Sequence, residues 1–248
     1  MGPPSTSGFL HRHATGPQPR HRLVCVPHAG ASPAFFASWS RFLPEQVELV
    51  SARFCGSGGD GPESLHAFAD AAAAELDRLP KRRTVLFGHS MGAIAAYETA
   101  LRVRRSRITR LLVSGSPAPD EHRSDDAHLL DDEGLAAELV RLGGTGGGLF
   151  DDRESRATWL PRIRRDYQLV NAHEPSAQRL ECPITAVVGD ADPEAPLDGV
   201  RRWRELTAAG FDLKVFTGGH FYLLQRQEEL LAEVRRHLGR ACAGSAMP

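Results

Sequence analysis

Gly88-His89-Ser90-Met91-Gly92 is the stretch that decides the fold of this chain. It reads G-x-S-x-G, follows the apolar run Thr84–Phe87 and leads directly into Ala93–Tyr97, a good opening for a helix. A serine between a strand and a helix, with glycines two residues before and after it, is typical of a nucleophile elbow, where a strained turn points the hydroxyl out of a sheet. We therefore expect Ser90 to be a nucleophile and both glycines to lie against neighbouring backbone.

The composition excludes several classes of protein. The 248 residues are 41% hydrophobic and carry a formal net charge of -1, which suits one globular domain with a sizeable core. The near-neutral balance argues against a nucleic-acid partner, and no apolar run is long enough to span a membrane. The four cysteines are scattered without a C-x-x-C pair, which argues against a disulfide framework or a zinc site. We expect a monomer in the reduced cytoplasm, with no metal and no other cofactor.

The two ends of the chain differ from its centre. Residues 1–22 are rich in Pro, Ser, His and Arg and lack the apolar region of a secretory signal, so we expect a disordered N-terminal arm. Residues 23–240 form the predicted domain, and residues 241–248 a loose C-terminal tail.

Short apolar runs alternate with longer helical patterns through the domain. The predicted strands are Leu23–Val26, Val47–Phe54, Thr84–Phe87, Leu111–Ser114, Ile184–Val188 and Leu213–Phe216. The predicted helices are Ala34–Phe42, Leu65–Leu79, Met91–Val103, Leu197–Ala208 and Gln225–His237. This alternation predicts an α/β fold with a mostly parallel sheet flanked by helices, whose active site lies at the carboxyl ends of the strands.

One stretch, from about residue 120 to residue 180, contains no good strand. Two apolar stripes at helical spacing lie in it, and a glycine-rich break, Gly143–Gly148, separates them. The stripes are Leu135, Leu139 and Leu142, and Trp159, Leu160, Ile163, Tyr167 and Val170. We interpret the stretch as a helical lid inserted over the sheet, although two ordinary surface helices would give the same pattern.

A serine nucleophile needs a base and an acid that orients the base, and on this kind of sheet the chain order is serine, acid, histidine. His220 follows the last predicted strand and two glycines, which allow a tight loop, so we expect it to be the base. The acid belongs after Ile184–Val188, where Asp192 is the preferred candidate. Asp190 is nearer the strand end and suits a loop-holding hydrogen bond, while Asp120, before the insertion, is a third option.

The oxyanion of the tetrahedral intermediate needs two N–H donors. We expect the backbone N–H of Met91, directly after the nucleophile, and that of Ala29, in the loop after the first strand. His28 beside Ala29 either lines the entrance or is a polar loop residue.

Three other stretches imitate functional motifs. Gly30–Ala34 resembles the elbow, but Pro33 follows its serine and has no N–H to donate. Gly56–Gly61 reads G-x-G-x-x-G but follows the second strand and does not open a helix, so we interpret it as a flexible loop at the pocket rim. The basic stretch Arg102–Arg110 suits a carrier-protein or phosphate contact, but a solvated helix end with cations near the C-terminal dipole is the preferred interpretation.

Together these residues resemble the type II thioesterases that accompany polyketide and nonribosomal peptide synthetases and animal fatty acid synthase. The elbow, Pro27–Gly30 after the first strand, Leu139–Thr145 in the insertion and Gly218–Leu224 around the histidine carry the resemblance, which covers most of residues 23–224. The sequence departs from the family where Cys55-Gly56-Ser57-Gly58 replaces the usual P-G-R-G and where Ala31 replaces a glycine. Both departures concern the pocket rim.

The resemblance implies an α/β-hydrolase fold and hydrolysis of acyl thioesters on the phosphopantetheine arm of acyl or peptidyl carrier proteins, as an editing reaction. It also implies Ser90 as nucleophile, His220 as base, Asp192 as acid, and Ala29 and Met91 as oxyanion donors. Three alternatives remain open: a small-molecule esterase or lipase with the same triad, an acyltransferase, and a non-catalytic module that binds acyl carrier proteins.

Overall fold

Seven strands form a single sheet in the computed structural model, which describes residues 8–13, 16–54, 61–121, 126–143 and 150–243. The strands are β1 Leu10–Arg12, β2 His21–Val26, β3 Val47–Ala52, β4 Arg83–His89, β5 Arg107–Ser114, β6 Ile184–Gly189 and β7 Phe211–Phe216. Their order is β1-β3-β2-β4-β5-β6-β7, and every neighbouring pair is parallel except β1 with β3. The predicted α/β class and mostly parallel sheet are confirmed.

Strand β1 corrects the expectation of a disordered arm over residues 1–22. Leu10 pairs with Ala52 and Arg12 with Val50, antiparallel to β3, and the Glu75 carboxylate accepts hydrogen bonds from the backbone N–H groups of Phe9 and Leu10. These pairing and hydrogen-bond partners lie 38 to 66 residues away, so the composition of the segment gave no signal for them.

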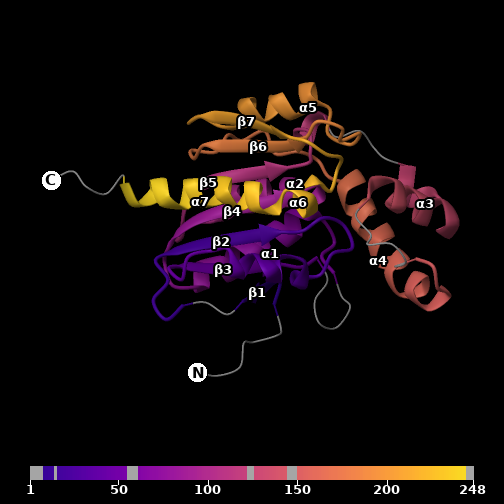
Figure 1. Cartoon of the computed structure of the whole chain (residues 1–248), viewed down its shortest axis with the longest axis horizontal. Helices are drawn as coiled ribbons and strands as arrows, with labels where there is room; N and C mark the ends of the chain where they lie inside the picture. The colour runs from indigo at the N-terminus through magenta and orange to yellow at the C-terminus, as the bar shows by residue number, and fades with distance from the viewer. Residues whose placement is uncertain (1–7, 14–15, 55–60, 122–125, 144–149, 244–248) are drawn as a thin grey trace.

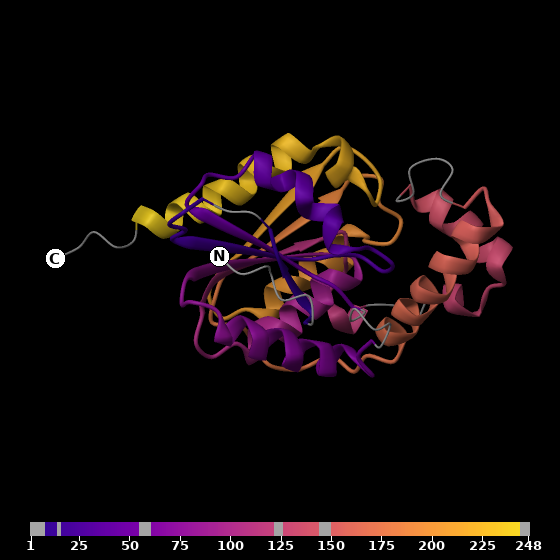
Figure 2. The same ribbon diagram turned by 90° about the horizontal axis from the view of Figure 1, so that it is seen from below.

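Helices cover both faces of the sheet (Figure 2). One face packs against α1 Leu65–Arg78, α2 Met91–Arg102, α5 Leu197–Arg201 and η4 Arg202–Leu206, and the other against η1 Pro33–Arg41, α6 Tyr222–Gln225 and α7 Gln227–Ala243. Alternate side chains of β2 enter the two cores: Val24 and Val26 on one face, Leu23 and Cys25 on the other. Burial on both faces explains why the strands read as continuous apolar runs.

Three predicted helices differ in detail from those observed. The first is a 3-10 helix that Pro33 opens, and the predicted helix Leu197–Ala208 is a short α-helix that continues as the 3-10 helix η4. The last is divided between α6 and α7 at Arg226. The differences concern helix type and bounds, and the three elements keep their predicted places along the chain.

The stretch between β5 and β6 leaves the sheet as predicted and forms η2 Pro119–Glu121, η3 Asp126–Leu129, α3 Asp132–Leu142 and α4 Arg153–Asn171. In Figure 1, α3 and α4 lie beyond the end of the sheet toward which the parallel strands point. The two apolar stripes pack against each other in a separate small core that includes Leu135, Leu160 and Ile163. No helix in the described ranges has both the length and the apolar character that a bilayer crossing requires.

Candidate active site

Ser90 occupies the sharp turn between β4 and α2 that the sequence predicts. Its backbone has φ 55° and ψ -128°, and it is the one non-glycine residue with positive φ among those the structure describes. Such a conformation costs about 1–3 kcal/mol and is typical of functional turns. A Cβ on Gly88 would lie 2.0 Å from the Gly92 carbonyl oxygen, and one on Gly92 2.2 Å from that of Val26. Both glycines are therefore required by close backbone contact, as expected.

His220 and Asp192 form a buried pair at the ends of two neighbouring strands. His220 follows β7, Asp192 follows β6, and Nδ1 of the histidine lies 3.0 Å from both carboxylate oxygens. The Asp192 carboxylate also accepts a hydrogen bond from the backbone N–H of Glu194 at 3.0 Å. Because an ionised carboxylate only accepts, His220 donates from Nδ1 and keeps the Nε2 lone pair free to act as a base.

The two other candidate acids lie elsewhere. Asp190 accepts a hydrogen bond from the backbone N–H of Gly218 at 2.9 Å, so it holds the histidine loop, as expected of the residue nearer the strand. Asp120 is in η2 and pairs with Arg202 at 2.7 Å. Among the three carboxylates that the sequence offered, Asp192 is the one that contacts His220.

A second histidine links the elbow to the His220 pair. The ring of His89, directly before Ser90, lies 4.9 Å from that of His220, measured between centroids. Its Nδ1 is 3.0 Å from the Ser114 hydroxyl at the end of β5, and that hydroxyl is 2.8 Å from the Tyr222 hydroxyl. No local sequence pattern indicates this chain of contacts, because it joins residues on three elements. Burial and the neighbouring His220 lower the pKa of His89 well below its usual value, which keeps the ring neutral.

The loop after β2 brings the predicted oxyanion donor Ala29 to the same edge of the sheet. The start of α2 touches this loop directly, since a Cβ on Gly92 would lie 2.5 Å from the Pro27 carbonyl oxygen. Met91 opens α2, and the first N–H groups of a helix have no partner within it. The start of α2 and the loop that carries Ala29 therefore lie against each other.

A cavity of about 210 Å³ adjoins this region. It lies between the loop after β2 and the inserted helices, and its lining includes His28, Phe35, Leu139, Trp159, Ile163 and Phe221. Of the two interpretations of His28, the structure therefore favours the one that lines the entrance. Burial, with a contribution from His220, lowers the pKa of His28 to about 3, so its ring is neutral near pH 7.

Helix α4 contacts two loops at the edge of the sheet where the strands end. Asp166 accepts a hydrogen bond from the backbone N–H of Gly30 at 2.7 Å, and Arg165 donates one to the Gly61 carbonyl oxygen at 2.8 Å. Asp166 was not predicted from the sequence, although a signal was present: it lies three residues after Ile163 and four before Val170, on the apolar stripe of its helix. A carboxylate in such a stripe requires a partner from another element.

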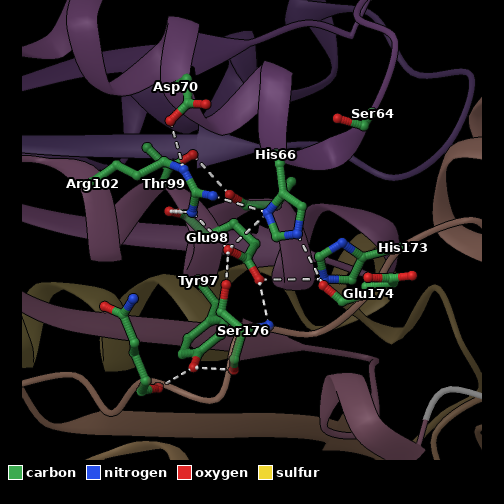
Figure 3. Close-up of polar contacts among 12 residues, drawn as sticks. Ser64, His66, Asp70, Tyr97, Glu98, Thr99, Arg102, His173, Glu174 and Ser176 are labelled. Carbon is green, nitrogen blue, oxygen red and sulfur yellow. Dashed lines mark hydrogen bonds and ion pairs between the residues drawn. The ribbon is translucent and has the colours of Figure 1, made fainter.

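A polar cluster around Glu98 joins the end of the inserted segment to α1 and α2 (Figure 3). The Glu98 side chain is fully buried and accepts hydrogen bonds from Arg102 at 2.7 Å and from the Ser176 hydroxyl at 2.8 Å. His66 Nδ1 and His173 Nε2 each lie 3.3 Å from one of its oxygens. Burial alone would raise the pKa of Glu98, but the groups on His173, Ser176 and Arg102 hold it at about 2.

The cluster contains one set of side chains that resembles a metal site. Ligand atoms of His66, Glu98 and His173 lie within 4.8 Å of one another. The Arg102 guanidinium, however, donates to both Glu98 and His66 Nδ1, the latter at 2.9 Å, and so supplies the positive charge at this place. His66 Nε2 is bound to the Glu174 carbonyl oxygen at 2.9 Å. We therefore interpret the cluster as an ion-pair anchor.

Two of the three stretches that imitate functional motifs have structural roles. Ser32 precedes η1 as its N-cap residue, with Pro33 in the first turn. In the basic stretch, Arg102 pairs with Glu98 and Asp70, and Arg110 with Asp212, which favours the structural interpretation. Residues 55–60 of the expected rim loop and residues 144–149 of the glycine-rich break lie outside the described part of the chain.

Comparison with known proteins agrees with this geometry. Residues 21–238 match the family model described as the thioesterase domain. The chain is 36% identical over 237 residues to the probable cadicidin biosynthesis thioesterase of Streptomyces griseus, covering 93% of this chain and 66% of that protein. It is 36% identical over 240 residues to thioesterase PikA5 of Streptomyces venezuelae, covering 93% of this chain and 85% of the other.

The solved structures give the same result. BorB, the type II thioesterase from the borrelidin biosynthetic cluster, superposes with a TM-score of 0.84 at 33% identity, covering 93% of this chain and 97% of that one. Fold and elbow define the chain as an α/β hydrolase. It belongs to the thioesterase family, and within it to the type II thioesterases of polyketide and nonribosomal peptide pathways.

Proposed function

We propose that this thioesterase releases acyl groups from the phosphopantetheine arm of acyl or peptidyl carrier proteins through a Ser90, His220, Asp192 triad. The observation that carries the proposal is the buried contact of His220 Nδ1 with the Asp192 carboxylate at 3.0 Å, next to the strained elbow that bears Ser90. The family supports the same substrate class, because type II thioesterases act on thioesters bound to carrier proteins.

The reaction is a two-step acyl transfer. His220 Nε2 accepts the Ser90 proton as the hydroxyl oxygen attacks the thioester carbonyl carbon, and the N–H groups of Met91 and Ala29 bind the oxyanion. Collapse of the intermediate breaks the carbon–sulfur bond, and the phosphopantetheine thiol leaves with the proton from His220. Water then attacks the acyl-enzyme with the same base, which frees the carboxylic acid and restores Ser90.

In this proposal the inserted segment, residues 120–180, acts as the lid of the acyl chamber. The cavity between the loop after β2 and helices α3 and α4 supports it, because its walls include the apolar Leu139, Trp159 and Ile163 from the insertion. An apolar chamber next to the nucleophile suits an acyl chain, while the arm has to enter past the same helices.

The test is hydrolysis of an acyl-loaded carrier protein, followed by intact-protein mass spectrometry, for wild type and Ser90→Ala in parallel. We expect wild type to unload the carrier and Ser90→Ala to lose at least about 10³-fold in rate, because the triad acts as a unit. Circular dichroism of both proteins controls for folding. Substantial unloading by the folded Ser90→Ala protein would exclude Ser90 as the nucleophile.

The alternatives give distinct results in the same assay. A simple oxygen ester as a second substrate distinguishes a general esterase, which would cleave the ester and leave the carrier loaded. Transfer of the acyl group to an added amine or alcohol in preference to water would identify an acyltransferase. Carrier binding without turnover of either substrate would identify a non-catalytic module.

A further inference from the structure

The contact between helix α4 and the loop after β2 has two parts, one apolar and one polar. Gly30 adopts φ +76°, and a Cβ there would lie 2.3 Å from Ile163 Cγ1. One turn further along the helix, Asp166 accepts the Gly30 N–H at 2.7 Å. The helix therefore packs directly on the backbone of the loop, at the peptide group that joins Ala29 to Gly30.

The Asp166 carboxylate is buried with few partners. The residue is 4% exposed, and its Oδ1 has no hydrogen-bond partner within the described ranges, while Oδ2 binds Gly30. Burial raises the pKa of Asp166 to about 6, while the Gly30 N–H and the charge of Arg165 act in the opposite direction. A buried carboxylate with a single donor costs free energy, so a role in packing alone would be better served by a neutral side chain.

The charged groups of the surrounding elements are mostly engaged elsewhere. Arg165 on α4 is the charged neighbour that acts on Asp166, and His28 in the facing loop is neutral near pH 7. Three of these groups, on α3 and η3, are paired with residues of α4 itself: Asp132 with Arg164, Glu133 with Arg156, and His128 with Asn171. Two more pairs lie on α2 and on the loops after β6 and β7: Glu98 with Arg102, and Asp192 with His220. Asp166 is thus the acidic group directed at the oxyanion loop from the inserted segment.

We infer that Asp166 is a positioning residue for acyl transfer: from helix α4, its carboxylate holds the peptide that joins Ala29 to Gly30. The Ala29 N–H belongs to the peptide directly before it, so fixing the one peptide positions the N–H that donates to the oxyanion. This inference rests on the proposed function, since it needs Ala29 as a donor. It also makes the contact between α4 and the loop a condition for a formed oxyanion hole, because the carboxylate comes from α4 and the donor from the loop.

The physical reason is the strength and direction of the bond. A hydrogen bond from an N–H to an ionised carboxylate is shorter and about twice as strong as one between neutral groups. An oxyanion donor contributes only when it points at the position that the oxygen occupies in the transition state. A looser loop therefore lowers kcat more than it changes KM, since the ground-state thioester uses this donor less.

Asp166→Asn tests the inference, because the amide keeps the shape and removes the charge. If the amide oxygen faces Gly30, it accepts as a neutral group, and the amide NH₂ lies where Oδ1 has no partner. If the NH₂ faces Gly30, two donors meet and no bond forms. In both orientations the bond to Gly30 is weaker than in wild type. We expect kcat on an acyl-loaded carrier protein to fall about 10-fold while KM stays within about twofold. Arg164→Gln is the matched control, because Arg164 is on the same helix and binds Asp132 and the carbonyl oxygens of His128 and Leu130, so within the described residues its hydrogen bonds stay inside the inserted segment.

A second readout needs no turnover. In an NMR titration of the Ser90→Ala protein between pH 5 and 7.5, we expect the Gly30 amide resonance to shift with a midpoint near the pKa of Asp166. Addition of Asp166→Asn should abolish this titration, whereas addition of Arg164→Gln should keep it.

The two measurements separate the inference from the proposed function. A Gly30 resonance that does not titrate, or that titrates equally in the Asp166→Asn protein, overturns the inference. So does an unchanged kcat in a folded Asp166→Asn enzyme whose Ser90→Ala counterpart is inactive. Failure of wild type to unload any carrier, with the Gly30 titration intact, refutes the proposed function instead and leaves the contact between α4 and the loop established.

Discussion

Glu98 and Asp166 are two buried carboxylates on helices, and each joins the inserted segment to the sheet domain. Their environments differ in the number of donors. Glu98 on α2 is surrounded by His66, Arg102, His173 and Ser176, and its pKa falls to about 2. Asp166 on α4 has the single donor Gly30, and its pKa rises to about 6.

The difference teaches that burial does not by itself decide the pKa of a carboxylate. Desolvation acts on both groups in the same direction, toward the neutral form. Several hydrogen bonds and a guanidinium outweigh it at Glu98, whereas one backbone N–H does not at Asp166. The end of the insertion is therefore anchored by a permanent charge cluster, and its contact with the active-site loop depends on a group that titrates near neutral pH.

The largest effect should come from removing each carboxylate. Glu98→Ala leaves a buried cavity and removes the carboxylate that Arg102 and two histidines contact. We therefore expect a loss of about 3–5 kcal/mol in the free energy of unfolding. Asp166→Ala leaves the Gly30 N–H without its acceptor, but it also removes a buried charge. We therefore expect a loss of about 1 kcal/mol or less in the free energy of unfolding at pH 7.5. Urea denaturation of both variants measures this. Equal losses would show that the two carboxylates contribute equally to stability, whatever their number of donors.

An intermediate effect should come from the loop side of the Asp166 contact. Gly30→Ala places a Cβ 2.3 Å from Ile163 Cγ1 at φ +76°, so we expect a loss of about 2–4 kcal/mol from overpacking and backbone strain together. Gly143→Ala is the matched control, with φ +81° and open space around the new Cβ, and should lose only the strain, about 1 kcal/mol. Thermal unfolding of the two variants should differ clearly. Similar losses would mean that Ile163 and helix α4 can shift to accommodate the added methyl group at little cost.

The smallest effect is a difference in pH dependence. The folded pKa of Asp166, about 6, lies above its usual value of 3.8, so the folded state binds this proton more tightly than the unfolded state does. The group therefore adds stability as the pH falls through 6 toward 3.8, and that stability is lost again as the pH rises above 6. Relative to Asp166→Asn, we expect wild type to gain about 1.4 kcal/mol between pH 7.5 and pH 5.

The pKa of Glu98 is shifted in the opposite direction, so its contribution to stability depends on pH with the opposite sign. Its folded pKa of about 2 lies below the usual 4.5, so its contribution is present above pH 4.5 and is lost as the pH falls toward 2. Relative to Glu98→Gln, wild type should therefore show no change between pH 7.5 and pH 5. Urea unfolding curves at the two pH values measure both differences, and a flat profile for the Asp166 pair would show that this carboxyl keeps an ordinary pKa.

Much of the fold was predictable because its signals are local. Five of the six strands that the sequence predicts are runs buried on both faces, whereas the last, in β7 at the edge of the sheet, is partly exposed. The elbow at Ser90 depends on glycines within two residues of it. His220 and Asp192 were predicted as base and acid from chain order and from their places after strands, and the structure brings the two side chains into contact at 3.0 Å. Strand β1 was missed, because its pairing with β3 and its bonds to Glu75 are properties of distant residues.

The sequence by itself determined the α/β class, the sharp turn at Ser90 and the positions of the inserted helices, since periodicity, glycine spacing and strand-end loops act over a few residues. Only the tertiary structure decided which helix meets which loop. Asp166 and Gly30 are 136 residues apart, and Ser176 lies 78 residues from Glu98, so neither contact has a local pattern. The pKa of each carboxylate is likewise a tertiary property, because it depends on how many donors the fold brings to a buried place.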